Sequence, residues 1–115
     1  PDEAVSSFWE LQRDLALSAT QLDNKTKELI GLSMASHIKC RYCIPFHTEA
    51  AREFGATDEE MREAIAMGGL TVTFSNNITG MQTPLETFRE EVNRALQHLA
   101  GASAGAEAAP GHQHA

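Results

Sequence analysis

Apolar residues recur every three or four positions along most of the chain, which is the spacing of one face of an α-helix. In residues 2–20 the apolar positions include Val5, Phe8 and Leu15. The alternation typical of a half-buried strand is absent, and Ala, Leu and Glu, which favour helices, are abundant. The pattern predicts an all-α fold of five to six helices.

Capping residues predict where several helices begin and end. Asp23 or Asn24 suits the start of a second helix. Gly55 suits a left-handed stop after a third helix that begins near the cysteines. Thr57 with Glu60 forms the capping-box pattern at the start of a fourth.

The C-terminal part of the chain predicts further helices and then a tail without large apolar side chains. We expect Gly68 and Gly69 to interrupt the fourth helix, a further helix over residues 70–81, and a last helix from Leu85 to about Leu99. Residues 100–115 contain no large apolar side chain, so we expect a disordered tail. The predicted organisation is a helical domain over residues 1–99 and a tail over 100–115.

The length and net charge of the chain argue against some classes of function. The 115 residues suit one domain, and the net charge of −7 argues against a nucleic-acid partner. No stretch is long and apolar enough to cross a bilayer, and no signal-peptide pattern is visible. We therefore expect no membrane partner and a cytoplasmic location.

The two cysteines, Cys40 and Cys43, are the main chemical feature. They would close only a tiny loop, so a stapling role is a poor explanation, and a redox or metal-binding role is favoured. His47 follows Cys43 by one helical turn and lies on the same face. Pro45 is tolerated only in a first turn, which places Cys43 at a helix start, where the pKa of a thiol falls.

Two further residues bear on this site. Glu28 precedes Cys40 by twelve positions, and this spacing by itself favours a solvated helix residue. Two antiparallel helices joined near Lys39 could instead bring its carboxylate to His47, where it could act as the third member of a proton relay. The alternative is a metal site formed by His37, Cys40, Cys43 and His47. The aromatic residues Phe8 and Trp9 are expected in the core or at a subunit interface.

These motifs resemble the AhpD-like alkyl hydroperoxidases of the carboxymuconolactone decarboxylase superfamily. The resemblance rests on Glu28, on Cys40-x-x-Cys43-x-x-x-His47, and on the Gly-Ala-Thr cap that begins at Gly55. It implies an AhpD-like helical bundle and disulfide-dependent peroxidase activity. It also implies that Cys43 attacks the hydroperoxide, that Cys40 resolves the sulfenic acid, and that Glu28 and His47 relay protons.

The resemblance further implies partners and assembly. A dithiol or lipoyl-type protein would re-reduce the disulfide, no bound cofactor is expected, and a single helical repeat would form a homotrimer or homohexamer. The best-known members carry His between the cysteines where this chain has Tyr42, which can hydrogen-bond but not shuttle protons near neutral pH. The rival functions are a metal-binding or redox-sensing module, or another small-molecule enzyme of the same fold.

Overall fold

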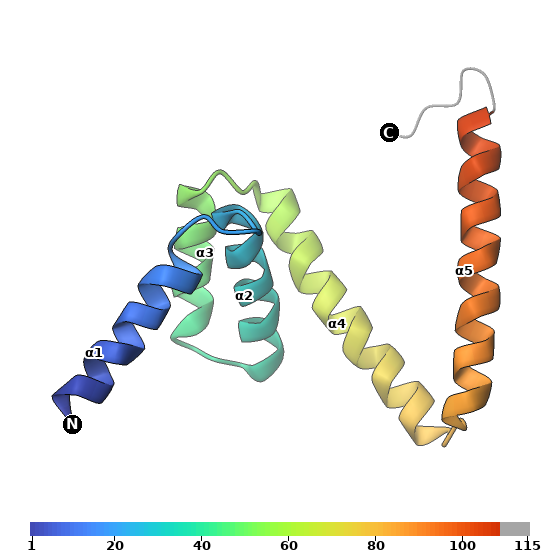
Figure 1. Ribbon diagram of the computed structural model, residues 1–115, viewed down its shortest axis with the longest axis horizontal. Helices are drawn as coiled ribbons and strands as arrows, with labels where there is room; N and C mark the ends of the chain where they lie inside the picture. The colour runs from blue at the N-terminus through green and yellow to red at the C-terminus, as the bar shows by residue number, and fades with distance from the viewer. Residues whose placement is uncertain (109–115) are drawn as a thin grey trace. The chain divides into compact units, whose positions relative to one another are not determined.

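The computed structural model describes residues 1–108 and contains five α-helices and one π-helical turn (Figure 1). The elements are α1 (Asp2–Leu11), η1 (Gln12–Ala16), α2 (Asn24–Ile38), α3 (Cys43–Glu53), α4 (Asp58–Gly80) and α5 (Leu85–Ala108). No strand occurs among the described residues. The predicted all-α class is confirmed.

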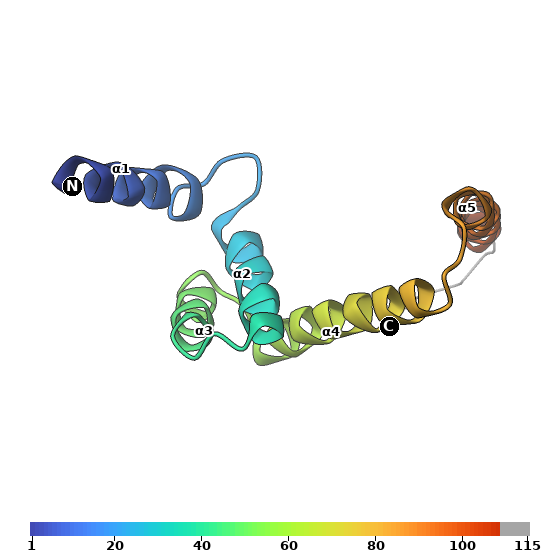
Figure 2. The same ribbon diagram turned by 90° about the horizontal axis from the view of Figure 1, so that it is seen from below.

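The chain divides into two compact units, one formed by Pro1–Ser75 and the other beginning at Asn76. In the first unit α2 and α3 pack side by side and run in opposite directions (Figures 1 and 2). Leu32, Ala51 and Met61 form the buried cluster between α2, α3 and the start of α4. Within the part of the chain that the structure describes, the buried core is therefore small, and it lies beside α2.

Local capping signals determine the helix starts as predicted. The Thr26 N–H donates to the Asp23 side chain at 2.7 Å, and this bond begins α2. The Glu60 N–H donates to Thr57 Oγ1 and the Thr57 N–H donates to Glu60 Oε1, both at 3.0 Å, which completes the capping box of α4. Gly55 has a φ of +89°, the left-handed conformation expected after α3.

The predicted break at Gly68 and Gly69 is wrong, because α4 continues through both residues. A Cβ atom at Gly68 would collide with Ser33 Oγ of α2. Gly68 thus allows α2 and α4 to approach closely, and the helix absorbs a propensity cost of about 1 kcal/mol per glycine. The segment predicted as a separate helix over residues 70–81 belongs to the same element as far as Gly80.

Two other helix ends also differ from the predictions. The first helical segment ends at Ala16, short of residue 20. There the Ser18 hydroxyl donates to the Arg13 carbonyl at 2.7 Å and competes with further helical bonds. α5 passes the predicted end near Leu99 and continues to Ala108, since alanine has the highest helix propensity. The rest of the predicted tail, residues 109–115, lies outside the described residues.

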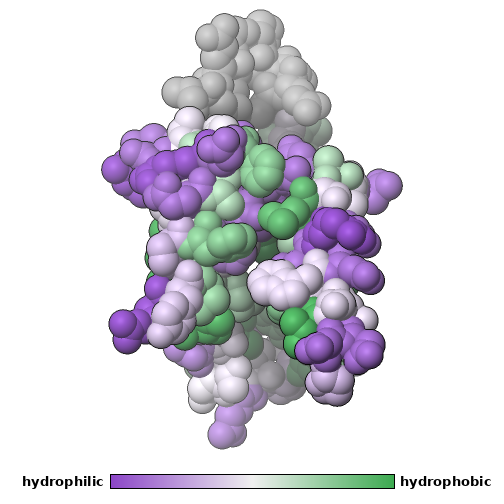
Figure 3. Space-filling view, turned by 90° about the vertical axis from the view of Figure 1, so that its left-hand side faces the viewer, coloured by the Kyte–Doolittle hydropathy of each residue, from purple (hydrophilic) through white to green (hydrophobic). Residues whose placement is uncertain are grey.

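Many large apolar side chains lie on the surface, and Figure 3 shows such side chains among polar ones on one face. In the second unit Leu85, Leu96 and Leu99 of α5 are each more than half exposed. None of the described helices is both long and apolar enough to span a bilayer.

Candidate active site

The two cysteines lie at the junction between α2 and α3. Lys39 ends α2 in a left-handed conformation with a φ of 59°, and α3 begins at Cys43. Cys40 and Cys43 form a disulfide, with their Cα atoms 5.2 Å apart. Cys43 and Pro45 both lie in the first turn of α3, as the sequence predicted.

The first amides of α3 point at Cys40. The Cys43 N–H donates to Cys40 Sγ at 3.1 Å, and the Ile44 N–H donates to the Cys40 carbonyl at 3.0 Å. Backbone amides at a helix start stabilise negative charge. This position therefore suits a cysteine pair whose chemistry passes through a thiolate.

A buried carboxylate contacts an imidazole beside the disulfide. His47 Nδ1 lies 2.6 Å from Glu28 Oε2, and Glu28 is only 2% exposed. The bond joins α2 to α3 across nineteen positions, as expected for antiparallel helices. Because Nδ1 faces Glu28, Nε2 is the ring nitrogen left to exchange protons with a molecule at the cysteines.

Gly31 leaves room for the His47 ring, and the sequence did not predict this role of Gly31. A Cβ atom at Gly31 would lie 2.5 Å from His47 Cε1 and 2.6 Å from Nδ1. The ring therefore lies directly against the α2 backbone, one turn after Glu28. The available signal was a glycine inside an otherwise apolar helical pattern.

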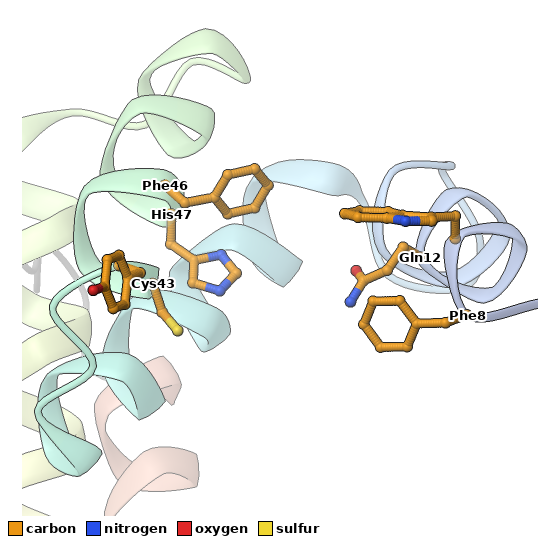
Figure 4. Close-up of a pocket in the computed structure, with 7 residues that line it drawn as sticks. Phe8, Gln12, Cys43, Phe46 and His47 are labelled. Carbon is orange, nitrogen blue, oxygen red and sulfur yellow. The ribbon is translucent and has the colours of Figure 1, made fainter. Parts of the chain in front are cut away.

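A hollow of about 350 Å³ opens beside Cys43 and His47 (Figure 4). Its walls come from α1, η1 and α3, and its lining residues are Phe8, Trp9, Gln12, Tyr42, Cys43, Phe46 and His47. Phe8 is 54% exposed and Trp9 is 64% exposed. The core alternative of the expectation for these two residues is wrong, because both are exposed and line this hollow, whereas the subunit-interface alternative stays a prediction.

Tyr42 lies at the same hollow and is mostly exposed. The Arg41 guanidinium carbon lies 5.5 Å from the centre of its ring, at cation–π distance. Tyr42 thus presents its ring at the mouth of the site.

The alternative metal site is not formed. Among the described residues no three His, Cys, Asp or Glu side chains gather closely enough to hold a metal ion. Cys40 and Cys43 are joined to each other, and His37 lines a different hollow with Ser33 and Ile65. The structure brings together Glu28, His47 and the cysteine pair, and leaves His37 apart.

Comparisons with known proteins support the helical fold and identify a family. The carboxymuconolactone decarboxylase family model matches residues 3–78. The AhpD alkylhydroperoxidase core of Rhodospirillum rubrum superposes with a TM-score of 0.65 and 33% sequence identity, covering 72% of this chain and 62% of that one. A Thermotoga maritima protein of known structure superposes with a TM-score of 0.53 and 28% identity, covering 79% of this chain and 83% of that one.

A curated relative, uncharacterized protein 4 in the cox locus of Paracoccus denitrificans, is 46% identical over 44 residues. This match covers 38% of the present chain and 40% of the relative. The chain therefore spans less than two thirds of the Paracoccus relative and of the Rhodospirillum core. The family match over most of the first unit, together with the AhpD-like arrangement of helices, shows that the chain belongs to the carboxymuconolactone decarboxylase family.

Proposed function

We propose that this protein is a thiol–disulfide oxidoreductase that reduces hydroperoxides. The observation that carries the proposal is the 2.6 Å contact between the buried Glu28 and His47, beside the Cys40–Cys43 pair. The similarity to a chain described as an alkylhydroperoxidase core supports the same chemistry.

Cys43 is the proposed attacking residue, because it lines the hollow with His47 and Cys40 does not. His47 takes the proton of the Cys43 thiol, the resulting thiolate attacks the terminal oxygen of the hydroperoxide, and the O–O bond breaks. The sulfur becomes a sulfenic acid, and the leaving alkoxide takes a proton from His47 to give the alcohol. Glu28 stabilises the imidazolium that precedes this transfer and holds the ring in place.

Cys40 is the proposed resolving residue. Its sulfur attacks the sulfenic sulfur of Cys43, which forms the disulfide and releases water. A dithiol donor of the lipoyl type then exchanges with this disulfide, so the donor is oxidised and both cysteines are reduced. The electrons for each cycle come from that donor.

Assembly into a homotrimer or homohexamer is part of the proposal. Large side chains such as Met34, Met67 and Phe74 are more than half exposed on α2 and α4. Exposed apolar surface of this extent is typical of a protein that associates.

The test is hydroperoxide consumption with a dithiol donor. Wild type should turn over, Cys43→Ser should lose activity, and Cys40→Ser should accumulate a sulfenic acid on Cys43 that dimedone traps. The two serine variants control for each other, since each removes one sulfur from the same turn. Equal consumption by wild type and Cys43→Ser would contradict the proposal.

A further inference from the structure

The wall of the hollow opposite Cys43 and His47 comes from the first helix (Figure 4). Phe8 and Trp9 of α1 form an edge-to-face pair, with ring centres 5.5 Å apart and ring planes at 75°. Both side chains are more than half exposed, although they lie across from a reactive centre. Adjacent exposed aromatic rings at the mouth of a pocket are a surface that a bound apolar group would cover.

This wall is anchored to the helix that carries the relay. Lys27 Nζ donates to the Leu15 carbonyl at 2.5 Å, to the Ser18 carbonyl at 2.9 Å and to Thr20 Oγ1 at 2.6 Å. These three bonds fasten the end of η1 and the turn after it to α2. Lys27 precedes Glu28, so the anchor and the relay carboxylate are neighbours on one helix.

The wall continues from α1 into the π-helical turn η1. The Leu17 N–H donates to the Gln12 carbonyl at 3.1 Å, a bond across five positions. Such turns are rare in proteins, and those that occur are often found at functional sites. Gln12 begins the turn, and its side chain reaches into the hollow between α1 and α3 (Figure 4).

We propose that α1 and η1 form the specificity wall of the thiol site, defined by Phe8, Trp9 and Gln12, with Lys27 as its positioning residue. The wall selects hydroperoxides that carry a bulky apolar group, aromatic groups above all, over hydrogen peroxide. A pocket of about 350 Å³ fits such a small molecule, whereas hydrogen peroxide gains nothing from aromatic walls. This inference rests on the proposed peroxidase function and adds a choice of substrate.

The kinetic test compares cumene hydroperoxide with hydrogen peroxide. In the double variant Phe8→Ala/Trp9→Ala, kcat/KM for cumene hydroperoxide should fall about tenfold, while the value for hydrogen peroxide stays unchanged. Lys27→Met should reproduce this loss of preference, because it releases the wall. Leu11→Ala is the matched control, since Leu11 is an exposed apolar residue of the same helix that does not line the hollow.

Three results would overturn the specificity wall. The first is an unchanged or parallel response to the two peroxides. The second is an effect confined to the KM of the dithiol donor, which would make the wall a reductant site. The third is a change of oligomeric state in the double variant, which would make it a subunit contact.

A binding readout separates this inference from the peroxidase proposal. Trp9 is the single tryptophan of the chain, so its fluorescence reports on the wall directly. In the inactive Cys43→Ser variant, cumyl alcohol should change Trp9 emission in a saturable way, and adding Phe8→Ala should weaken that binding about tenfold. If wild type consumes no peroxide, the peroxidase proposal fails, and this titration still decides the wall: saturable binding supports it and a flat response overturns it.

Discussion

The α2–α3 pair and α5 are both built of amphipathic helix, yet they bury their side chains very differently. α2 and α3 bury Glu28, Leu32, Ala35 and Ala51 against each other and the start of α4. α5 buries no residue among those the structure describes, and its leucines stay exposed. The small buried core therefore lies in the pair of helices that carries the candidate site.

In the α2–α3 pair, the residues that stabilise the fold lie next to the residues of the candidate site. Glu28 and Leu32 are one turn apart on the buried face of α2, so the packing that joins the helices also places the carboxylate against His47. Damage to the α2–α3 core should therefore lower both stability and activity.

The largest expected contrast is between two leucine truncations. Leu32→Ala should lower the free energy of unfolding by about 3 kcal/mol, because it leaves a cavity at a residue only 2% exposed. Leu96→Ala, at a residue 57% exposed, should change it by less than about 0.5 kcal/mol. Urea unfolding followed by circular dichroism measures both values, and equal losses would show that α5 has a core of its own.

The next contrast is between two glycines. Gly31→Ala should reduce peroxide turnover about tenfold or more, because the new methyl group displaces the His47 ring from the α2 backbone. Gly69→Ala adds the same methyl group in α4, where nothing lies within 4 Å, and should leave turnover unchanged while stabilising the helix slightly. Steady-state kinetics of the purified variants measures this, and a Gly31→Ala protein with wild-type turnover would refute the role of this contact.

The smallest expected effect is on the pH dependence of stability. The hydrogen bond and charge of Lys25 and the bond from Thr57 hold the pKa of the Glu60 carboxyl below its usual range, and Glu60 raises the pKa of Lys25. A carboxylate with a lowered pKa in the folded state stabilises the fold above its unfolded-state pKa, and this contribution is lost as the pH falls through the folded value.

Glu60→Gln keeps the cap oxygen and removes the charge. The variant should have a slightly lower urea midpoint than wild type at neutral pH, and the difference should disappear as the pH falls through the lowered folded-state pKa of Glu60. Glu59→Gln, on the same turn and paired with Arg62, is the matched control. A difference that persists in acid would show that the charge of Glu60 is not its cause.

Local signals in the sequence predicted most of the helix starts and half of the site. Asp23, Gly55 and the Thr57–Glu60 box act within one turn, so the residues alone identify them. The spacing of Cys43 and His47 is equally local. Glu28 entered through family resemblance, because its contact crosses nineteen positions and depends on how α2 and α3 pair.

Most of the features that the sequence did not predict are products of packing between distant segments. Gly68 looked like a helix break because its reason, the close approach of Ser33, lies on another helix. For Phe8 and Trp9 the sequence predicts a core or a subunit interface, because apolarity alone does not distinguish these from a pocket wall. The continuation of α5 to Ala108 has a local cause: the lack of large apolar side chains predicts a tail, although alanine favours helix.

The central claim is that the buried Glu28–His47 pair drives the chemistry of the adjacent cysteines, and single-turnover oxidation tests it most directly. Reduced protein is mixed with one equivalent of cumene hydroperoxide, and the rate of Cys40–Cys43 disulfide formation is measured by rapid quench and mass spectrometry. Glu28→Gln should slow this rate about a hundredfold, whereas Glu49→Gln, the same change at an exposed site on α3, should leave it unchanged. Equal rates in wild type and both variants would contradict the claim.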